Sequence, residues 1–86
     1  MTEKIIISGF GGQGVMFLGK LLARAGMYEG KHVTYFPSYG TEVRGGTAHC
    51  NVIISEKEIA SPVIDIADTL IIMNQPSFDK FISYLK

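Results

Sequence analysis

The sequence predicts an α/β fold: a three-layer sandwich around a mixed, mainly parallel sheet. Three observations support this prediction. The apolar run 5–7 is typical of a strand that is buried on both faces. A glycine-rich segment, 8–14, follows it, and the stretch 15–28 then carries apolar residues at helical spacing. A strand that turns through glycines into a helix is the usual opening of an α/β domain with a Rossmann-like arrangement.

The remaining elements are predicted from turns and periodicity. Residues 31–36 favour a second strand, which Pro37 should end. The polar loop 38–47 has too few residues for a parallel crossover, so the third strand, 48–55, is expected to run antiparallel. We then expect a brief helical turn at 63–67, an apolar strand at 69–73 and a helix that enters through Asn74 and Pro76. That helix should present one apolar face, made of Phe78, Phe81, Ile82 and Leu85.

The first helix is apolar on more than one side. Its sheet-facing stripe is predicted to consist of Val15, Leu18, Leu22 and Ala25. Only Lys20 and Arg24 form a polar strip, and four further apolar residues lie outside the stripe. Either another subunit or further sequence covers them, or the small domain wraps the helix internally. These four residues are Met16, Phe17, Leu21 and Met27.

Composition restricts the class of protein. The 86 residues are 47% hydrophobic and carry eight basic and eight acidic side chains, which is typical of a single globular domain. No basic run favours nucleic acid, and no apolar stretch is long enough to span a membrane. The N-terminus lacks signal-peptide features, so a cytoplasmic location is expected.

The glycine segment matches two nucleotide-binding patterns incompletely. Gly9, Gly11 and Gly14 satisfy G-x-G-x-x-G, but the second strand ends at 34–37 without the acidic residue that would hold a ribose. The stretch 14–20 matches G-x-x-x-x-G-K, but Leu21 replaces the Ser or Thr that would bind magnesium. Both the dinucleotide and the P-loop interpretations are therefore disfavoured.

A third interpretation treats the glycine segment as part of a docking rim. Loops at the carboxyl ends of parallel strands converge, which would bring together 11–14, 38–46 and 74–75. Arg44 offers a planar donor fork that suits carboxylate or phosphate. Alternatively, Arg44 pairs locally with Glu42 and the glycines only shape turns. The candidate contact residues are Gly11, Gly12, Gln13, Gly14, Tyr39, Glu42, Arg44, Gly45 and Gly46.

Other residues favour structural roles. Cys50 is the only cysteine, which excludes an internal disulfide, and its apolar neighbours predict a buried thiol. His32 and His49 have no second ligand at metal-binding spacing. Asp65 and Asp68 are expected to cap or solvate a turn, not to act as an acid–base pair.

Several ordered motifs together carry a family resemblance. They are Gly9-Phe10-Gly11-Gly12-Gln13-Gly14-Val15, Gly19 with Leu22-Ala23, Ser38-Tyr39-Gly40-x-Glu42-x-Arg44-Gly45-Gly46, Val52-x-Ile54-Ser55 and Ile59-x-Ser61-Pro62. In this combination the chain resembles the gamma subunit of 2-oxoacid:ferredoxin oxidoreductases, from Lys4 to about Gln75. The 2-oxoglutarate enzyme looks nearest, with the pyruvate, branched-chain and indolepyruvate enzymes as close alternatives.

The resemblance implies oxidative decarboxylation of a 2-oxoacid with coenzyme A, with electrons passing to ferredoxin. It implies no catalytic residue and no cofactor held by this chain alone: thiamine diphosphate, Mg²⁺ and iron–sulfur clusters would lie on alpha, beta and ferredoxin-like delta subunits. Family gamma subunits are longer, so residues 1–86 are expected to be the N-terminal portion of one gamma domain. The alternative is a free-standing nucleotide-binding or regulatory module that uses the turn at 11–14.

Overall fold

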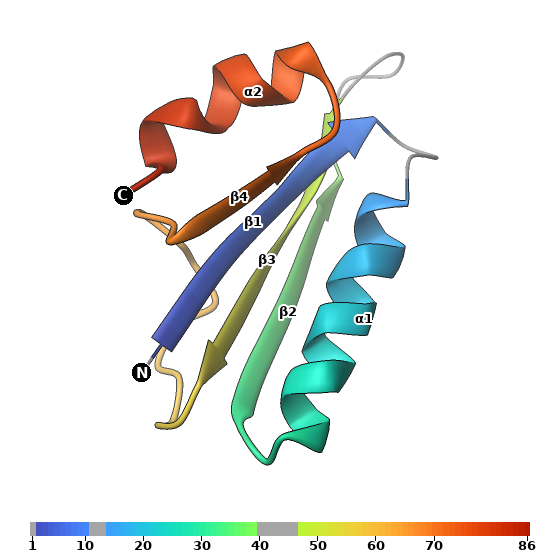
Figure 1. Cartoon of the computed structure of the whole chain (residues 1–86). Helices are drawn as coiled ribbons and strands as arrows, with labels where there is room; N and C mark the ends of the chain where they lie inside the picture. The colour runs from blue at the N-terminus through green and yellow to red at the C-terminus, as the bar shows by residue number, and fades with distance from the viewer. Residues whose placement is uncertain (1, 11–13, 40–46) are drawn as a thin grey trace.

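The computed structural model describes residues 2–10, 14–39 and 47–86. Strand β1 (Thr2–Phe10) precedes helix α1 (Val15–Tyr28), and strands β2 (His32–Tyr39) and β3 (Thr47–Ser55) follow (Figure 1). Strand β4 (Thr69–Ile72), helix α2 (Gln75–Phe81) and the short 3₁₀ helix η1 (Ile82–Tyr84) complete the order. Within the described ranges, no helix has the length and apolarity needed to cross a membrane.

The four strands form one mixed sheet in the order β2-β3-β1-β4. Strand β3 is antiparallel to both of its neighbours, and β1 pairs with β4 in parallel. The prediction of a mixed sheet with an antiparallel third strand is confirmed. The prediction of mainly parallel pairing is wrong, because β3 returns between β1 and β2 and separates two strands that point in the same direction (Figure 1).

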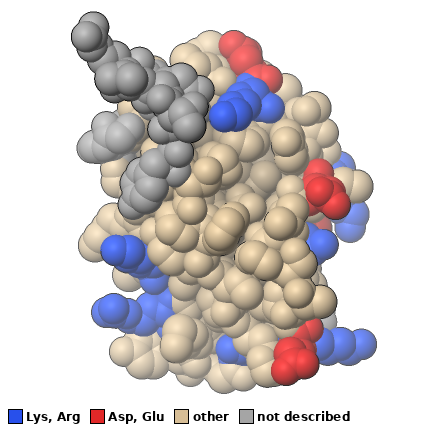
Figure 2. Space-filling view, turned by 180° about the vertical axis from the view of Figure 1, so that it is seen from behind, with Lys and Arg blue, Asp and Glu red and all other residues tan. Residues whose placement is uncertain are grey.

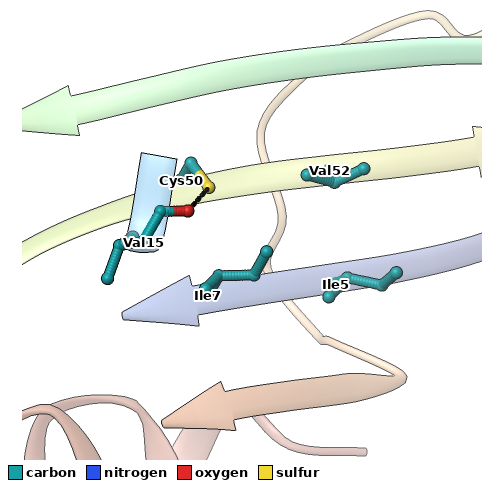
Figure 3. Close-up of a cluster of buried hydrophobic side chains, with 5 residues drawn as sticks. All are labelled: Ile5, Ile7, Val15, Cys50 and Val52. Atoms are coloured by element: carbon teal, nitrogen blue, oxygen red, sulfur yellow. Dashed lines mark hydrogen bonds between the residues drawn. The ribbon is translucent and has the colours of Figure 1, made fainter. Parts of the chain in front are cut away.

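The core lies on both faces of β1, because successive strand residues point to opposite sides. Ile5 and Ile7 pack toward α1, whereas Ile6 packs toward α2. The α1-side cluster consists of Ile5, Ile7, Val15, Cys50 and Val52 (Figure 3). The opposite cluster consists of Ile6, Ile53, Ile64, Ala67 and Phe81. Helix, sheet and helix therefore form the three predicted layers.

Helix α1 occupies its predicted residues, but its inner face differs from the predicted stripe. The buried residues are Val15, Gly19, Ala23 and Gly26, while Ala25 is exposed. A Cβ atom at Gly19 would collide with the Cys50 sulfur and lie 2.9 Å from Cε1 of Tyr35. The helix therefore approaches the sheet through its smallest residues, and Leu18 and Leu22 pack beside this contact.

Strand β2 continues through Pro37, which was predicted to end it. The position of the strand explains this difference. Strand β2 lies at the edge of the sheet formed by the described strands, where a proline that lacks an N–H group is tolerated because one side of β2 pairs with none of those strands.

The C-terminal segment also differs from prediction. Residues 63–67 form bends and a bridge instead of a helical turn. Helix α2 begins as predicted, but it ends at Phe81, and within it only Ser77 and Phe81 are buried. The predicted apolar face is therefore largely exposed, at 43% for Phe78, 41% for Ile82 and 44% for Leu85.

Candidate functional site

The predicted docking rim lies at one end of the sheet. Phe10 of β1 pairs with Thr47, Tyr39 of β2 pairs with Ala48, and Ser8 lies opposite Ile72 of β4. Figure 1 shows β1, β2 and β4 pointing toward this end. The described residues that flank the three loops thus converge as predicted.

Gly14 starts α1 at this rim. Its backbone is left-handed, with φ 84° and ψ 14°, a conformation that favours glycine because other residues carry a Cβ atom. Its carbonyl oxygen accepts the first helical hydrogen bond from the Leu18 N–H at 2.9 Å. Gly14 is exposed, and in the described part of the chain no side chain caps this helix terminus. Among the described residues, the first backbone N–H groups of α1 thus have no side-chain cap.

The β4–α2 corner forms the neighbouring part of the rim. The Met73 N–H donates to the Ser8 carbonyl oxygen at 2.9 Å, which fixes the end of β4 against β1. Asn74 then caps α2, because its Oδ1 accepts from the Ser77 N–H at 2.9 Å. The predicted helix entrance is confirmed, and the Asn74 side-chain oxygen is used inside the fold.

A buried pair of serines lies below the rim. Ser8 Oγ donates to the Ala48 carbonyl oxygen at 3.3 Å and lies 2.9 Å from Ser77 Oγ in a second hydrogen bond. Both serines are fully buried. This link joins β1, β3 and α2, and the sequence analysis missed it. The available signal was the polar Ser8 at the end of the aliphatic run 5–7.

His49 lies on the α2 side of β3 and packs against Phe81, with ring centroids 4.8 Å apart. Burial lowers the pKa of His49, and the nearby Lys80 lowers this pKa further. Lys80 Nζ itself lies 5.4 Å from the centre of the Phe81 ring. The neutral imidazole is therefore favoured, and the residue functions here as a packing group between sheet and helix.

Most of the predicted contact residues lie outside the described residues. This applies to Gly11, Gly12 and Gln13 on the first loop. It applies equally to the second loop, with Glu42, Arg44, Gly45 and Gly46. Gly14 lies at the rim, and Tyr39 ends β2 there, paired through its backbone with Ala48. Their contacts with a partner or with coenzyme A remain predictions.

The predicted burial of Cys50 is confirmed, whereas Asp68 makes a long-range contact instead of the predicted cap of its own turn. Cys50 is fully buried, its sulfur lies 3.7 Å from the Val15 carbonyl oxygen, and burial raises the pKa of this thiol to about 11 (Figure 3). Asp68 Oδ2 accepts from the Lys4 N–H at 2.9 Å, so this carboxylate ties the turn before β4 to β1.

An open pocket of about 270 Å³ lies at the opposite end of the sheet from the rim. Its polar lining includes Lys4, Ser55 and Glu58, beneath the loop that follows β3. Thr2 and Ser55 hydroxyl groups hydrogen-bond at 2.9 Å along its wall. The sequence analysis did not predict this pocket, because it forms only where the loop 58–63 folds over the sheet.

On the face drawn in Figure 2, the described charges do not form a basic patch of the kind that binds nucleic acid. Figure 2 shows charged side chains of both signs along the periphery of one face, with a broad central area that carries neither sign. Among the described residues, no group of three or more His, Cys, Asp or Glu side chains could hold a metal ion.

Comparison with known proteins identifies the family. Residues 4–86 match the family model described as pyruvate ferredoxin/flavodoxin oxidoreductase. The chain is 49% identical over 78 residues to the ketoisovalerate oxidoreductase subunit VorA of Methanothermobacter thermautotrophicus, which covers 91% of this chain and 16% of that protein. It is 39% identical over 82 residues to the 2-oxoglutarate synthase subunit KorC of Methanocaldococcus jannaschii, covering 94% of this chain and 44% of that protein.

Solved structures agree. The gamma subunit of a keto/oxoacid ferredoxin oxidoreductase from Geobacter sulfurreducens superimposes with a TM-score of 0.85 at 34% identity, covering all of this chain and 46% of that one. A 2-oxoglutarate:ferredoxin oxidoreductase from Magnetococcus marinus gives 0.88 at 25% identity, covering 99% of this chain and 15% of that one. The chain thus spans less than half the length of these relatives. With the motifs and the fold in agreement, the chain belongs to the pyruvate ferredoxin/flavodoxin oxidoreductase family and corresponds to its gamma-type subunit.

Proposed function

We propose that the chain works as a gamma-type component of a coenzyme A-dependent 2-oxoacid:ferredoxin oxidoreductase. The observation that carries this proposal is the family match over residues 4–86, with the same fold in a gamma subunit. In the proposed complex, oxidative decarboxylation yields an acyl-CoA, and ferredoxin accepts the electrons. The proposed location is the cytoplasm.

The chain's own residues support a structural and assembly role. Within residues 1–86 the single cysteine, Cys50, is buried against α1, so these residues do not supply the four thiolates of an iron–sulfur cluster. On the basis of the family resemblance, we assign thiamine diphosphate, Mg²⁺ and iron–sulfur clusters to alpha, beta and ferredoxin-like delta subunits. The rim at Gly14 and the adjoining loops is the proposed contact with those subunits or with coenzyme A.

Two oxoacids are the best candidates. The identity of 49% to a ketoisovalerate oxidoreductase subunit favours a branched-chain oxoacid. The identity of 39% to a 2-oxoglutarate synthase subunit, together with the fold match to a 2-oxoglutarate enzyme, favours 2-oxoglutarate. The substrate-binding groups would lie largely on other subunits, so an assay of the complex is needed to choose between them.

The test is to tag this chain in its native host, purify the complex and measure ferredoxin reduction with 2-oxoglutarate, ketoisovalerate and pyruvate. We expect thiamine-binding subunits to copurify and one oxoacid to give coenzyme A-dependent reduction. Failure of those subunits to copurify would contradict the proposal. Saturable binding of NAD, FAD or ATP by the chain alone would instead support a free-standing module.

A substitution at Arg44 tests the proposed contact role of the rim within that complex. Arg44→Ala should weaken assembly or raise the coenzyme A concentration needed for half-maximal activity, because a bidentate donor is lost. The matched control is Lys57→Ala, which removes an exposed cation next to the opposite end of β3. Equal assembly and equal coenzyme A dependence in both variants would exclude the proposed role of Arg44.

A further inference from the structure

The outer face of α1 carries large side chains that the described fold leaves exposed. Phe17 is 72% exposed, Leu21 54%, Met27 66% and Tyr28 84%. Phe17, Leu21, Arg24 and Tyr28 follow one another at helical spacing, so they lie on one side of the helix. They extend over about 16 Å, given a rise of 1.5 Å per residue. We call Phe17, Lys20, Leu21, Arg24, Met27 and Tyr28 the outer α1 face.

The inner side of α1 is already used. Val15, Gly19, Ala23 and Gly26 are buried against the sheet. The helix cannot turn its large residues inward, because only residues without bulky side chains fit at Gly19 and Gly26: an added Cβ at Gly26 would lie 2.8 Å from Val33 Cγ2. A helix that is apolar on both sides is characteristic of a buried position, so the outer α1 face requires cover.

The charges on this face select the partner. The sequence of α1 contains Lys20 and Arg24 but no aspartate or glutamate. Both cations are exposed and lie among the apolar side chains of this face. A matching surface would place aliphatic side chains against Phe17 and Leu21 and carboxylates opposite the two cations. Aromatic residues, methionine and arginine are also the types enriched at protein–protein interfaces.

We propose that the outer α1 face docks an amphipathic, acidic helix of another polypeptide. A helix fits because side chains spaced three and four residues apart form ridges that fill the grooves of a second helix. A second copy of the chain fits poorly, since a two-fold contact would gather two lysines and two arginines in one seam with no carboxylate from α1. A lipid surface is also disfavoured, because two cations contribute little attraction to anionic lipids, at about 1 kcal/mol each.

The test uses the 86-residue chain and two synthetic helical peptides. Both peptides carry leucines along one face; one has glutamates on the flanks, and its twin has lysines at the same positions. Fluorescence anisotropy measures the dissociation constants. We expect saturable binding of the glutamate peptide, with the lysine peptide at least about fivefold weaker, in keeping with two surface ion pairs.

Variants distinguish specific binding at the outer α1 face from nonspecific hydrophobic binding. Phe17→Ser with Leu21→Ser should lower the affinity of the chain for the glutamate peptide about tenfold or more, since apolar anchors dominate such contacts. The control variant, Val63→Ser with Ile66→Ser, removes two exposed apolar groups from the loop before β4. It should leave the affinity for the glutamate peptide unchanged. Lys20→Glu with Arg24→Glu should reverse the peptide preference. Far-UV circular dichroism verifies that each variant is folded.

Other results would overturn the proposal. Equal affinity for the two peptides, or weakening by the control pair, would mean that the face does not select an acidic helix. Dimerisation that Phe17→Ser with Leu21→Ser abolishes would assign the face to a second copy. Binding to vesicles of phosphatidylcholine and phosphatidylglycerol in equal parts would assign it to lipid. The proposal concerns the surface of α1 and is independent of the oxidoreductase assignment, so either can fail without the other.

Discussion

The two sides of α1 differ in the size of their side chains more than in polarity. The side toward the sheet uses Gly19, Ala23 and Gly26, and the side toward solvent carries Phe17, Leu21 and Tyr28. In an ordinary surface helix the large apolar residues face the core. Here the close approach of helix and sheet at Gly19 and Gly26 leaves no room for larger side chains, while Leu18 and Leu22 pack beside this contact. Phe17, Leu21 and Tyr28 lie outside it and are available for a contact beyond the described fold.

This contrast shows what fixes the orientation of the helix. Hydrophobicity alone would permit several rotations of α1, because apolar residues surround it. The steric limits at Gly19 and Gly26 permit one, since any larger side chain there meets Cys50, Tyr35 or Val33. The orientation of α1 thus depends on the lack of side chains at Gly19 and Gly26 as much as on the apolar side chains that pack on the sheet.

The largest expected effect tests the inner side. Gly19→Leu should lower the free energy of unfolding by about 3 kcal/mol or more, because the side chain has no space between α1 and β3. Lys20→Leu, one residue along and exposed, should change it by no more than about 0.5 kcal/mol. Urea unfolding followed by circular dichroism measures both. Similar stability for the two variants would contradict the close-contact account.

A second experiment asks whether Cys50 sets that limit. Gly19→Ala should destabilise the fold by about 1–3 kcal/mol, and part of this loss should disappear when Cys50→Ala is added, because the colliding sulfur is gone. Unfolding free energies of the two single variants and the double variant give the coupling. Strict additivity would place the collision elsewhere, for example at Tyr35.

The buried thiol at this contact also predicts a pH dependence. Burial raises the pKa of Cys50 to about 11 from 9.0, so the fold favours the neutral thiol. The resulting stability is present below pH 9 and is lost as the pH rises from 9 toward 11. Wild type should therefore lose more stability than Cys50→Ala over this range. If the free energy of unfolding falls by the same amount in both proteins as the pH rises, Cys50 does not cause this pH dependence.

The smallest expected effect tests the outer side. Phe17→Ser should leave the stability of the isolated chain within about 0.5 kcal/mol, because the side chain is mostly in solvent before and after the change. Thermal unfolding of the variant and wild type provides the comparison. A loss of several degrees would mean that Phe17 packs inside this chain, and the outer α1 face would then lose its main apolar anchor.

Local patterns predicted much of the fold. The aliphatic run 5–7, the glycines before Val15 and the Asn74 cap are short-range signals, and each element they predicted is present. The length of the loop at 38–47 correctly predicted the direction of β3. The errors arose where tertiary context decides. Pro37 is tolerated only because β2 lies at an edge, and the inner face of α1 depends on the residues of β2 and β3 that it meets.

The sequence predicted which strand ends meet at one end of the sheet, whereas the contact roles of the candidate residues stay predictions. The rim follows from strand direction, which apolar runs and turns indicate. The Ser8–Ser77 bond joins residues far apart in the chain, and the pocket beside Lys4 depends on how a loop folds back. No spacing rule in a single sequence reports such contacts. The contact roles of Glu42 and Arg44 stay predictions, because those residues lie outside the described ranges.

The place of β3 has a consequence for the order of folding. Residues 2–39 contain β1, α1 and β2, yet β1 and β2 share no hydrogen-bonded ladder, since each pairs with β3. During synthesis, therefore, no sheet can form until residues 47–55 have left the ribosome. The pairing of Thr2 with Ser55 then closes nearly two thirds of the chain in one step, so these three strands should form as one cooperative unit.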